Sequence, residues 1–397
     1  MAGQFQSREG DLEQLFVTDY AMIDQYALTG SLWTWGRNGE GQLGDNTIVH
    51  RSSPIQTIAG GTNWKQVCGS QGHTAAIKTD GTLWLWGFNS NGQLGDNTIV
   101  HRSSPVQTVS GGTNWKQVAI GDYHTACIKT DGTLWNWGRN SEGQLGDNTI
   151  THKSSPIQTI AGGTNWKLVA SGNYHTAAIK TDGTLWLWGR NFSGELGDNT
   201  IVHRSSPIQT VAGGTNWKLV AGGTHTAAIK TDGTLWLWGF NTSGKLGDNT
   251  IANKSSPVQT VSGGTNWKQV SCGGNHTASI KTDGTLWTWG RNNTGQLGDN
   301  TIVHRSSPIQ TVAGGTNWKL VASGRYHTPC IKTDGTLWLW GHNSYSNSGQ
   351  LGDNTIVHRS SPIQTVAGGT NWKLVAGGSF HTTAIHFYEA GKLYPPS

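Results

Sequence analysis

Residues 225–239 read HTAAIKTDGTLWLWG, and this stretch decides the fold because near-copies of it recur along the whole chain. Successive copies lie 51 residues apart, except for one interval of 50 residues. The first tryptophan of each LWxWG segment is Trp33, Trp84, Trp135, Trp186, Trp236, Trp287 or Trp338. A TNWK tryptophan repeats in parallel at Trp64, Trp115, Trp166, Trp217, Trp267, Trp318 and Trp372. A repeat of this length indicates a propeller or a solenoid.

Each repeat predicts four short β-strands. The segment NWKxVA forms strand A and leads through a glycine turn to HTAAIK, strand B. A TDG turn, with the Asp-Gly pair of a tight hairpin, leads to TLWLWG, strand C. A longer connection then reaches PIQTV, strand D, whose first residue is a proline. Because proline has no N–H to donate, it suits the first residue of a strand or an outer edge. These prolines are Pro54, Pro105, Pro156, Pro207, Pro257, Pro308 and Pro362.

The repeats predict an all-β, seven-bladed propeller of four-stranded blades, because closing the ring removes long exposed sheet edges. An open solenoid is the alternative, and it needs distinct caps at both ends. The first LWTWG segment, 32–36, has no A and B strands before it, and the last A and B strands, within 371–385, have no C and D strands after them. We therefore expect residues 370–388 and 30–59 to form one blade together.

The motifs GQLGDN and HTAAIKTDGTLWLWG, with their spacing near 51 residues, resemble the repeats of the regulator of chromosome condensation family. The resemblance covers residues 30–388 and implies a seven-bladed propeller. The founding member of that family is a nucleotide-exchange factor for a small GTPase, which also docks on chromatin and acts through a wedge inserted in one blade. Here the insertion in GHNSYSNSGQLG of the seventh repeat is about three residues long. Exchange activity is therefore a less favoured interpretation.

Polar residues that recur in every repeat are expected to support the fold. A histidine opens each strand B, and such a ring of identical residues favours structural hydrogen bonding at the AB turn over a metal or catalytic site. These are His73, His124, His175, His225, His276, His327 and His381. The alternating tryptophans of strand C are expected to pack between neighbouring layers.

The GDN aspartates are expected to cap turns rather than bind calcium, because each loop offers a single carboxylate. They are Asp45, Asp96, Asp147, Asp198, Asp248, Asp299 and Asp353. A ring of basic residues before strand D is expected to pair with them: Arg51, Arg102, Lys153, Arg204, Lys254, Arg305 and Arg359. The four cysteines, Cys68, Cys127, Cys272 and Cys330, read as small buried residues rather than a disulfide or metal site. We expect no cofactor and no metal.

The charge is spread along the repeats. Residues 1–29 hold one basic and five acidic residues, a net charge of −4, and the remainder holds 27 basic and 18 acidic residues, a net charge of +9. Distributed around a ring, this is no nucleic-acid footprint, and we expect no groove of interleaved basic and aromatic residues. No apolar run of about 18 residues predicts a membrane span. The N-terminus also lacks the basic and apolar segments of a secretory signal.

Differences between the repeats gather in the AB turn and at the start of the CD connection, whereas the BC and DA turns barely change. In an up-and-down blade the AB and CD connections lie on the same face, so one face of the disc is varied. Aromatic and arginine side chains are the types that anchor protein interfaces. Drift in tolerant loops is the alternative. The predicted binding residues are Phe88, Tyr123, Tyr174, Phe192, Phe240, Arg325, Tyr326, Tyr345 and Phe380.

We expect no enzyme, because the charged residues that break the repeat, Asp122, Glu142, Glu195 and Lys245, lie scattered over different blades. Residues 1–29 fit no repeat and are interpreted as an attachment arm, and residues 389–397 as a C-terminal tail. The arm's predicted anchoring side chains are Leu12, Leu15, Phe16, Val17, Met22 and Ile23.

Near-identical repeats of this family behind such a leader resemble virion proteins of tailed phages. The resemblance implies a structural or host-recognition protein located in the virion. Its arm would bind virion proteins, and the propeller would bind a host surface or another protein. The alternative is a stand-alone, cytoplasmic protein-binding propeller, such as an enzyme inhibitor; some similar bacterial propellers inhibit enzymes through aromatic residues on one face. Neither interpretation includes nucleic-acid binding or membrane insertion.

Overall fold

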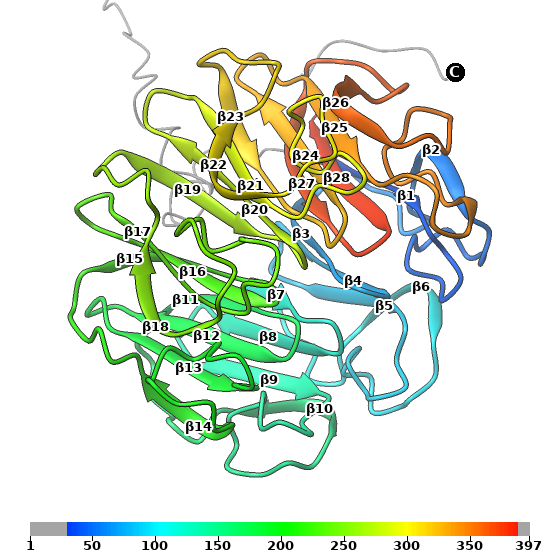
Figure 1. The fold of residues 1–397 in the computed structure, drawn as a ribbon. Coiled ribbons are helices and arrows are strands. Elements are labelled where there is room, and N and C mark those ends of the chain that lie inside the picture. The colour runs from blue at the N-terminus through cyan, green and yellow to red at the C-terminus, as the bar shows by residue number, and fades with distance from the viewer. Residues whose placement is uncertain (1–29, 388–397) are drawn as a thin grey trace, which may run out of the picture.

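The computed structural model describes residues 30–387, which form seven four-stranded antiparallel sheets arranged as the blades of a propeller (Figure 1). Blade I combines β27, β28, β1 and β2, and blades II to VII follow in chain order as β3–β6, β7–β10, β11–β14, β15–β18, β19–β22 and β23–β26. The prediction of an all-β, seven-bladed propeller is confirmed. The anchoring side chains predicted in residues 1–29, and the C-terminal tail, lie outside the described residues.

The four strands of a blade take their sequences from the same four segments of each repeat. The A strands are β3 (Trp64–Gly69), β7 (Trp115–Ile120), β11 (Trp166–Ser171), β15 (Trp217–Gly222), β19 (Trp267–Cys272), β23 (Trp318–Val321) and β27 (Trp372–Gly377). The B strands are β4 (His73–Lys78), β8 (His124–Lys129), β12 (His175–Lys180), β16 (His225–Lys230), β20 (His276–Lys281), β24 (His327–Lys332) and β28 (His381–Phe387).

The two outer strands of each blade complete the sheet. The C strands are β1 (Gly30–Gly36), β5 (Leu83–Gly87), β9 (Leu134–Gly138), β13 (Leu185–Gly189), β17 (Leu235–Gly239), β21 (Leu286–Gly290) and β25 (Leu337–Gly341). The D strands are β2 (Arg51–Gln56), β6 (Arg102–Gln107), β10 (Lys153–Gln158), β14 (Arg204–Gln209), β18 (Lys254–Gln259), β22 (Arg305–Gln310) and β26 (Arg359–Gln364). A short 3-10 turn, Tyr345–Asn347, lies in the CD loop of blade VII.

The two ends of the described chain join in blade I. Strand β1 pairs with β28 in an unbroken antiparallel register from Gly30 opposite Phe387 to Gly36 opposite His381. Figure 1 shows the blue β1 beside the red β28 at this seam. The prediction that the terminal half-blades combine is confirmed, and the closed ring excludes the open solenoid.

The start of strand D was predicted too late. In blade II the strand begins at Arg102, which pairs with Gly87, three residues before Pro105. The register then shifts so that Val106 pairs with Leu85, and the residues between Arg102 and Val106 bulge out of the ladder. Proline is therefore placed in a bulge on the outermost strand, where its missing N–H costs no ladder hydrogen bond.

The BC turn is the predicted tight hairpin. In blade II the Gly81 N–H donates to the Lys78 carbonyl at 2.9 Å, and Gly81 has a φ of +79°. The Asp80 carboxylate accepts hydrogen bonds from the Thr82 N–H at 2.9 Å and from its hydroxyl at 2.7 Å. Because these residues satisfy the turn locally, the same sequence serves in blades II to VII.

The hydrophobic core lies between blades. On strand β13 of blade IV, Leu185 and Leu187 face one side and pack in one cluster with Trp217 and Trp238 of blade V. The two tryptophan rings meet edge to face at 6.2 Å between centroids. Since side chains alternate along a strand, each C strand gives a leucine face to the next blade and a tryptophan face to its own strand A. This confirms the interlayer role predicted for the tryptophans.

Lysines at the ends of the B strands extend this packing in a way the sequence did not predict. The Lys230 ammonium lies 4.8 Å from the ring centroids of both Trp217 and Trp236. Equivalent lysines contact paired tryptophans in the other blades except blade I, where the His386 ring lies 4.9 Å from Trp372. These cation–π contacts cover the tryptophan rings on the face of the disc that carries the BC and DA turns.

Candidate functional site

The AB turns and CD loops converge on one face of the disc, called here the AB–CD face. The A strands surround a central channel of about 310 Å³, and the AB turns surround its mouth. The AB turn of each blade lies beside the CD loop of a neighbouring blade. For example, Phe88 of the blade II CD loop lies 5.7 Å from Tyr123 of the blade III AB turn. The face predicted to be varied is therefore one continuous surface.

Beneath this face the seven histidines link blade to blade. His175 Nε2 lies 2.8 Å from the Thr226 hydroxyl oxygen of the next blade, and that hydroxyl donates to the Glu195 carbonyl at 2.8 Å. Since the hydroxyl donates to the carbonyl, the imidazole Nε2–H donates to the hydroxyl. Equivalent pairs join all seven blades: His73–Thr125, His124–Thr176, His225–Thr277, His276–Thr328, His327–Thr382 and His381–Thr74.

The histidines are neutral parts of the fold. Burial lowers the pKa of His175 to about 3, so it carries no charge near neutral pH. The structural role predicted for these histidines is confirmed. The histidines also close the AB turn as predicted, since the His175 carbonyl accepts from the Gly172 N–H at 2.8 Å, whereas the Nε2 bonds between neighbouring blades were not predicted.

The GDN aspartates cap the CD loops as predicted. Asp198 Oδ1 accepts from the Thr200 N–H at 3.1 Å, the Thr200 hydroxyl at 2.7 Å and the Asn191 amide at 2.9 Å. Its Oδ2 pairs with Arg204 at 2.9 Å. The predicted basic partner forms this ion pair in six blades; within the described residues, Lys153 of blade III does not. These hydrogen bonds lower the pKa of Asp198 although burial opposes them.

The predicted binding rings form contacts along two arcs of the AB–CD face. In the first arc Tyr123 lies 5.7 Å from Phe88 and 6.0 Å from Tyr174. In the second, Phe380 stacks on Tyr345 at 3.8 Å and on Tyr326 at 4.9 Å. These arcs combine side chains from five blades.

The other predicted residues lie on the same face. Phe192 is 65% exposed and contacts the His203 ring at 4.3 Å. Phe240 covers Lys245, whose ammonium lies 4.2 Å from the ring centroid. Tyr345 is the other large exposed ring, at 43%.

Arginines interleave with these rings, which corrects the expectation that basic and aromatic residues would not alternate. Arg139 lies 5.7 Å from Tyr123 and 5.1 Å from Tyr174, and Arg190 continues the arc 5.4 Å from Tyr174. Arg37 lies 5.6 Å from Tyr345 in the second arc. The alternation was hidden because it runs from a CD loop to the AB turn of the adjacent blade, not along one repeat. The available signal was the residue after each LWxWG: Arg37, Phe88, Arg139, Arg190, Phe240, Arg291 and His342.

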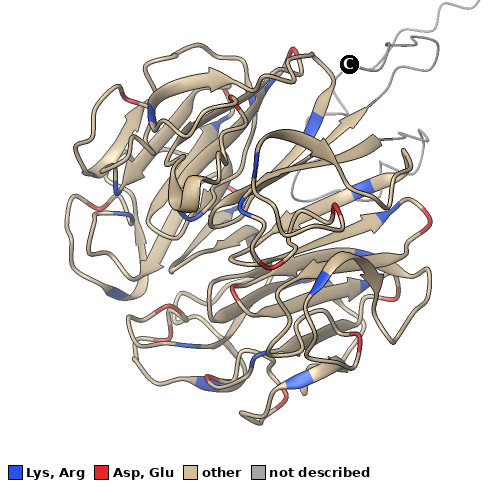
Figure 2. Cartoon of the chain, turned by 90° about the vertical axis from the view of Figure 1, so that its right-hand side faces the viewer, with Lys and Arg blue, Asp and Glu red and all other residues tan. Residues whose placement is uncertain are grey.

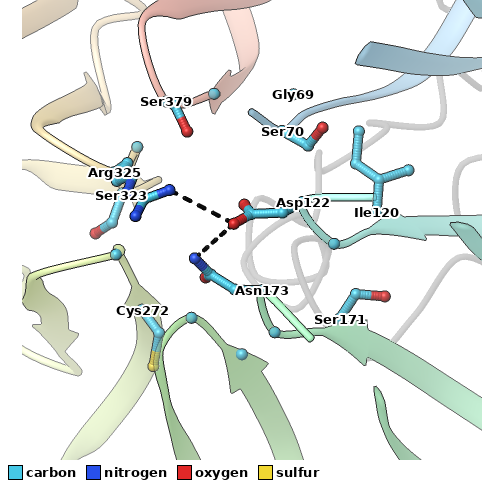
Figure 3. Close-up of a pocket in the computed structure, with 18 residues that line it drawn as sticks. Gly69, Ser70, Ile120, Asp122, Ser171, Asn173, Cys272, Ser323, Arg325 and Ser379 are labelled. Atoms are coloured by element: carbon cyan, nitrogen blue, oxygen red, sulfur yellow. Dashed lines mark hydrogen bonds and ion pairs between the residues drawn. The ribbon is translucent and has the colours of Figure 1, made fainter. Parts of the chain in front are cut away.

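At the channel mouth, Asp122 of blade III joins two other blades (Figure 3). Its Oδ2 accepts a hydrogen bond from the Asn173 amide at 2.9 Å and pairs with Arg325 of blade VII at 3.5 Å. Burial raises the pKa of Asp122 to about 6, although Arg325 and Asn173 oppose this shift. Figure 3 shows these three side chains pointing toward one another across the mouth.

The charged repeat-breaking residues come from different blades, as expected, but three of the four lie close together in the fold. Glu195 and Arg325 line one cavity, and Lys245 contacts two residues of its wall, Thr224 at 3.2 Å and Phe240. Asp122 does not line this cavity, but it pairs with Arg325, which does. Only Glu142 stays in its own loop, paired with Arg139 at 3.0 Å. Residues from different blades meet here because the AB turns point at the axis and each CD loop lies beside the AB turn of a neighbouring blade.

Elsewhere the charge remains dispersed around the ring, as Figure 2 shows for the basic and acidic positions. Within residues 30–387, no group of three or more His, Cys, Asp or Glu side chains is placed to hold a metal ion. All four cysteines are free: Cys127, Cys272 and Cys330 are buried and Cys68 is half-buried. No helix in the described part of the chain is long and apolar enough to span a membrane.

Comparison with known proteins agrees with this architecture. The RCC1-like domain matches residues 24–262, and the regulator of chromosome condensation (RCC1) repeat matches residues 283–331 and 334–385. The chain belongs to the RCC1-like propeller family. It is similar to the ultraviolet-B receptor UVR8 of Arabidopsis thaliana, with 32% identity over 352 residues, and to the human E3 ubiquitin-protein ligase HERC2, with 29% identity over 371 residues. These matches cover 83% and 90% of this chain, but only 64% and 8% of those relatives.

Solved structures show the same fold. Prp20p from Saccharomyces cerevisiae superposes with a TM-score of 0.80 at 18% identity, covering 94% of this chain and 96% of its own. Human WBSCR16 gives a TM-score of 0.77 at 21% identity, covering 90% and 98%. Prp20p binds Gsp1p and histones, and Prp20 has also been crystallised in complex with Kap60. RCC1 propellers therefore include protein-binding modules.

Proposed function

We propose that this chain is a non-enzymatic recognition propeller that binds a protein partner through its AB–CD face. The observation that carries the proposal is a difference between the two faces of the disc: the sequence of one face varies from repeat to repeat, and that of the other barely changes. The AB–CD face collects the varied aromatic rings and interleaves them with arginines, whereas the BC and DA turns repeat one sequence. Tyrosine and arginine are over-represented among residues that dominate binding energy, so this composition supports recognition over drift.

The geometry adds to this support. The rings are braced by each other and by guanidinium groups, such as Phe380 between Tyr345 and Tyr326. A side chain that is already held in one rotamer loses less conformational entropy when a partner covers it. The protein binding described for Prp20p supports the same class of function for this chain.

The test replaces Tyr123, Tyr174 and Tyr326 by Ser and measures binding to the partner captured by the intact chain. Loss of three interface tyrosines is expected to weaken binding by at least tenfold, because each ring that a partner buries contributes about 1 kcal/mol or more. The matched control replaces Thr130, Thr181 and Thr333 by Ala in the BC turns of the same three blades; they are exposed on the opposite face. Unchanged binding by the serine variant would overturn the proposal.

We further propose that the chain is a virion component of a tailed phage, attached through residues 1–29. The near-identity of the repeats and the apolar side chains of that acidic leader support this location. Deleting residues 1–29 is then expected to abolish incorporation into particles while leaving the propeller folded. Normal incorporation of the truncated chain would refute the attachment role.

A further inference from the structure

The one interval of 50 residues in the repeat has a structural location. His225 follows Trp217 by eight positions, whereas the histidine follows strand A's tryptophan by nine positions in the other blades. One residue is therefore missing from the AB turn of blade V, which reads Gly223-Thr224. The neighbouring turn of blade VI carries Gly274, where an added Cβ would collide with the Arg325 side chain.

A cavity of about 230 Å³ opens beside the shortened turn. Its walls come from blades IV, V and VII: Asn173, Tyr174, His175, Arg190, Glu195, Gly223, Thr224, Phe240 and Arg325. Since one water molecule takes about 30 Å³ in the liquid, the cavity has room for a small functional group. Three departures from the repeat meet at this cavity, namely the missing residue, Glu195 and Phe240, and a fourth, Lys245, lies against its wall.

Lys245 replaces the glutamine of the GQLGDN motif. In four other blades that glutamine accepts a hydrogen bond from a backbone N–H of its own loop, as Gln296 does from Thr294 at 2.9 Å. An ammonium group cannot accept, and Lys245 instead reaches the Thr224 hydroxyl at 3.2 Å. Lys245 is fully buried, and no described carboxylate lies within ion-pair distance of it.

Two guanidinium nitrogens of the cavity wall make no hydrogen bond to a described residue, whereas the donors of Asn173, Thr224 and His175 are already paired. The Nε atoms of Arg190 and Arg325 are buried and lack a hydrogen-bond partner among the described residues. Glu195 is already engaged, because its carboxylate accepts from the Ser193 N–H at 2.8 Å and lies 3.7 Å from Arg190. Arg190, Arg325 and Lys245 therefore lie near two carboxylates, those of Glu195 and Asp122, so the basic groups around the cavity outnumber the acidic ones.

We propose that this cavity binds a single carboxylate group between Arg190 and Arg325, with the Lys245 ammonium behind the Thr224 and Phe240 wall adding to the attraction. This inference rests on the proposed function, and it assigns the carboxylate to an acidic side chain of the protein partner. A negatively charged group suits this excess of basic groups, and the rings of Tyr174 and Phe240 would cover the side chain's apolar stem. Burial, with Arg291 and Arg325 nearby, lowers the pKa of Lys245 to about 7. A bound carboxylate therefore raises it.

The experiment titrates the full chain with the blocked peptide Ac-Gly-Glu-Gly-NH2, its glutamine twin and sodium acetate. The pKa of Lys245 is followed by carbon NMR of labelled lysine, with Lys245→Gln used to assign the signal. The glutamate peptide is expected to bind and to raise the Lys245 pKa, and the glutamine twin is not. Equal behaviour of the two peptides, or an unmoved Lys245 pKa, would overturn the proposal. Binding of acetate without binding of the glutamate peptide would refute the assignment to a protein side chain.

Matched variants sharpen the result. Lys245→Gln restores the residue of the other repeats, so it is expected to fold and to weaken the glutamate peptide by tenfold or more. Lys218→Gln is the control. It also removes one lysine charge, but at the start of strand β15, the end away from the AB turn, and it should leave binding unchanged. Glu195→Gln should tighten binding, because it removes the one negative charge in the wall. If the titration fails, the proposed function can still be tested separately. Replacing Tyr123, Tyr174 and Tyr326 by Ser measures partner binding through the aromatic arcs and does not depend on the cavity.

Discussion

The hydrogen bonds between blades predict how much one hydroxyl contributes to the closed ring. Thr226→Val removes an oxygen that accepts from His175 and donates to the Glu195 carbonyl, both at 2.8 Å, with no change in side-chain shape. The carbonyl keeps its bond from Trp238 Nε1 at 2.8 Å, but the His175 Nε2–H is left buried and unpaired. A lost buried bond together with an orphaned donor costs about 2 to 4 kcal/mol.

The same blade supplies a matched control. Thr260 is 4% exposed, and its hydroxyl has no partner among the described residues. Thr260→Val therefore makes the same chemical change without breaking a hydrogen bond, and it is expected to be neutral or slightly stabilising.

The assay is equilibrium unfolding in urea, followed by tryptophan fluorescence, with the three proteins compared at one pH. Thr226→Val is expected to lower the free energy of unfolding by about 2 to 4 kcal/mol relative to Thr260→Val. Equal stabilities, within about 0.5 kcal/mol, would refute the claim that the histidine–threonine ring stabilises the fold.

Three further predictions concern the same architecture. Burial lowers the pKa of six ring histidines to about 3 and that of His225 well below 6.5, so their stabilisation is complete above pH 6.5. Below pH 6.5 it falls by up to about 10 kcal/mol per pH unit for seven groups, which the pH dependence of the urea midpoint measures. Asp122 has a raised pKa of about 6, so its ionisation destabilises the fold as the pH rises from 3.8 through 6. Asp122→Asn is thus expected to be up to about 3 kcal/mol more stable than wild type at pH 7, with a smaller gap at pH 5.5; an unfolding series at both values checks this. Deleting residues 370–397 removes β27 and β28 and is expected to abolish cooperative unfolding; a retained sharp transition would contradict the seam in blade I.

The blades and the seam could be predicted because their determinants are local and repeated. The Asp-Gly turn and the alternating residues of strands B and C specify a hairpin within one repeat, and the missing half-repeats at the two ends specify closure. Strand D was harder. Its ladder contains a bulge before Pro105, and a bulge leaves no periodic pattern in the sequence.

The sequence predicted which face of the disc carries the candidate site, but not which residues on that face come together. Comparing repeats position by position finds the varied loops, but it cannot show which loops touch. Asp122 and Arg325 are far apart in the chain and meet because both AB turns point at the axis. The 50-residue interval was visible in the sequence, but the cavity it opens depends on Phe240, Glu195 and Arg325 arriving from three different blades.

The most direct test of the central claim is a binding comparison on the intact chain and two variants: the Tyr123, Tyr174 and Tyr326 serine variant, and the control with Thr130, Thr181 and Thr333 replaced by Ala. Affinity for the captured partner is measured for all three by calorimetry at one salt concentration. The account predicts that the serine variant binds at least tenfold more weakly and that the threonine control binds like wild type. Equal affinity of the serine variant and wild type, or loss of binding in the threonine control alone, would contradict recognition by the AB–CD face.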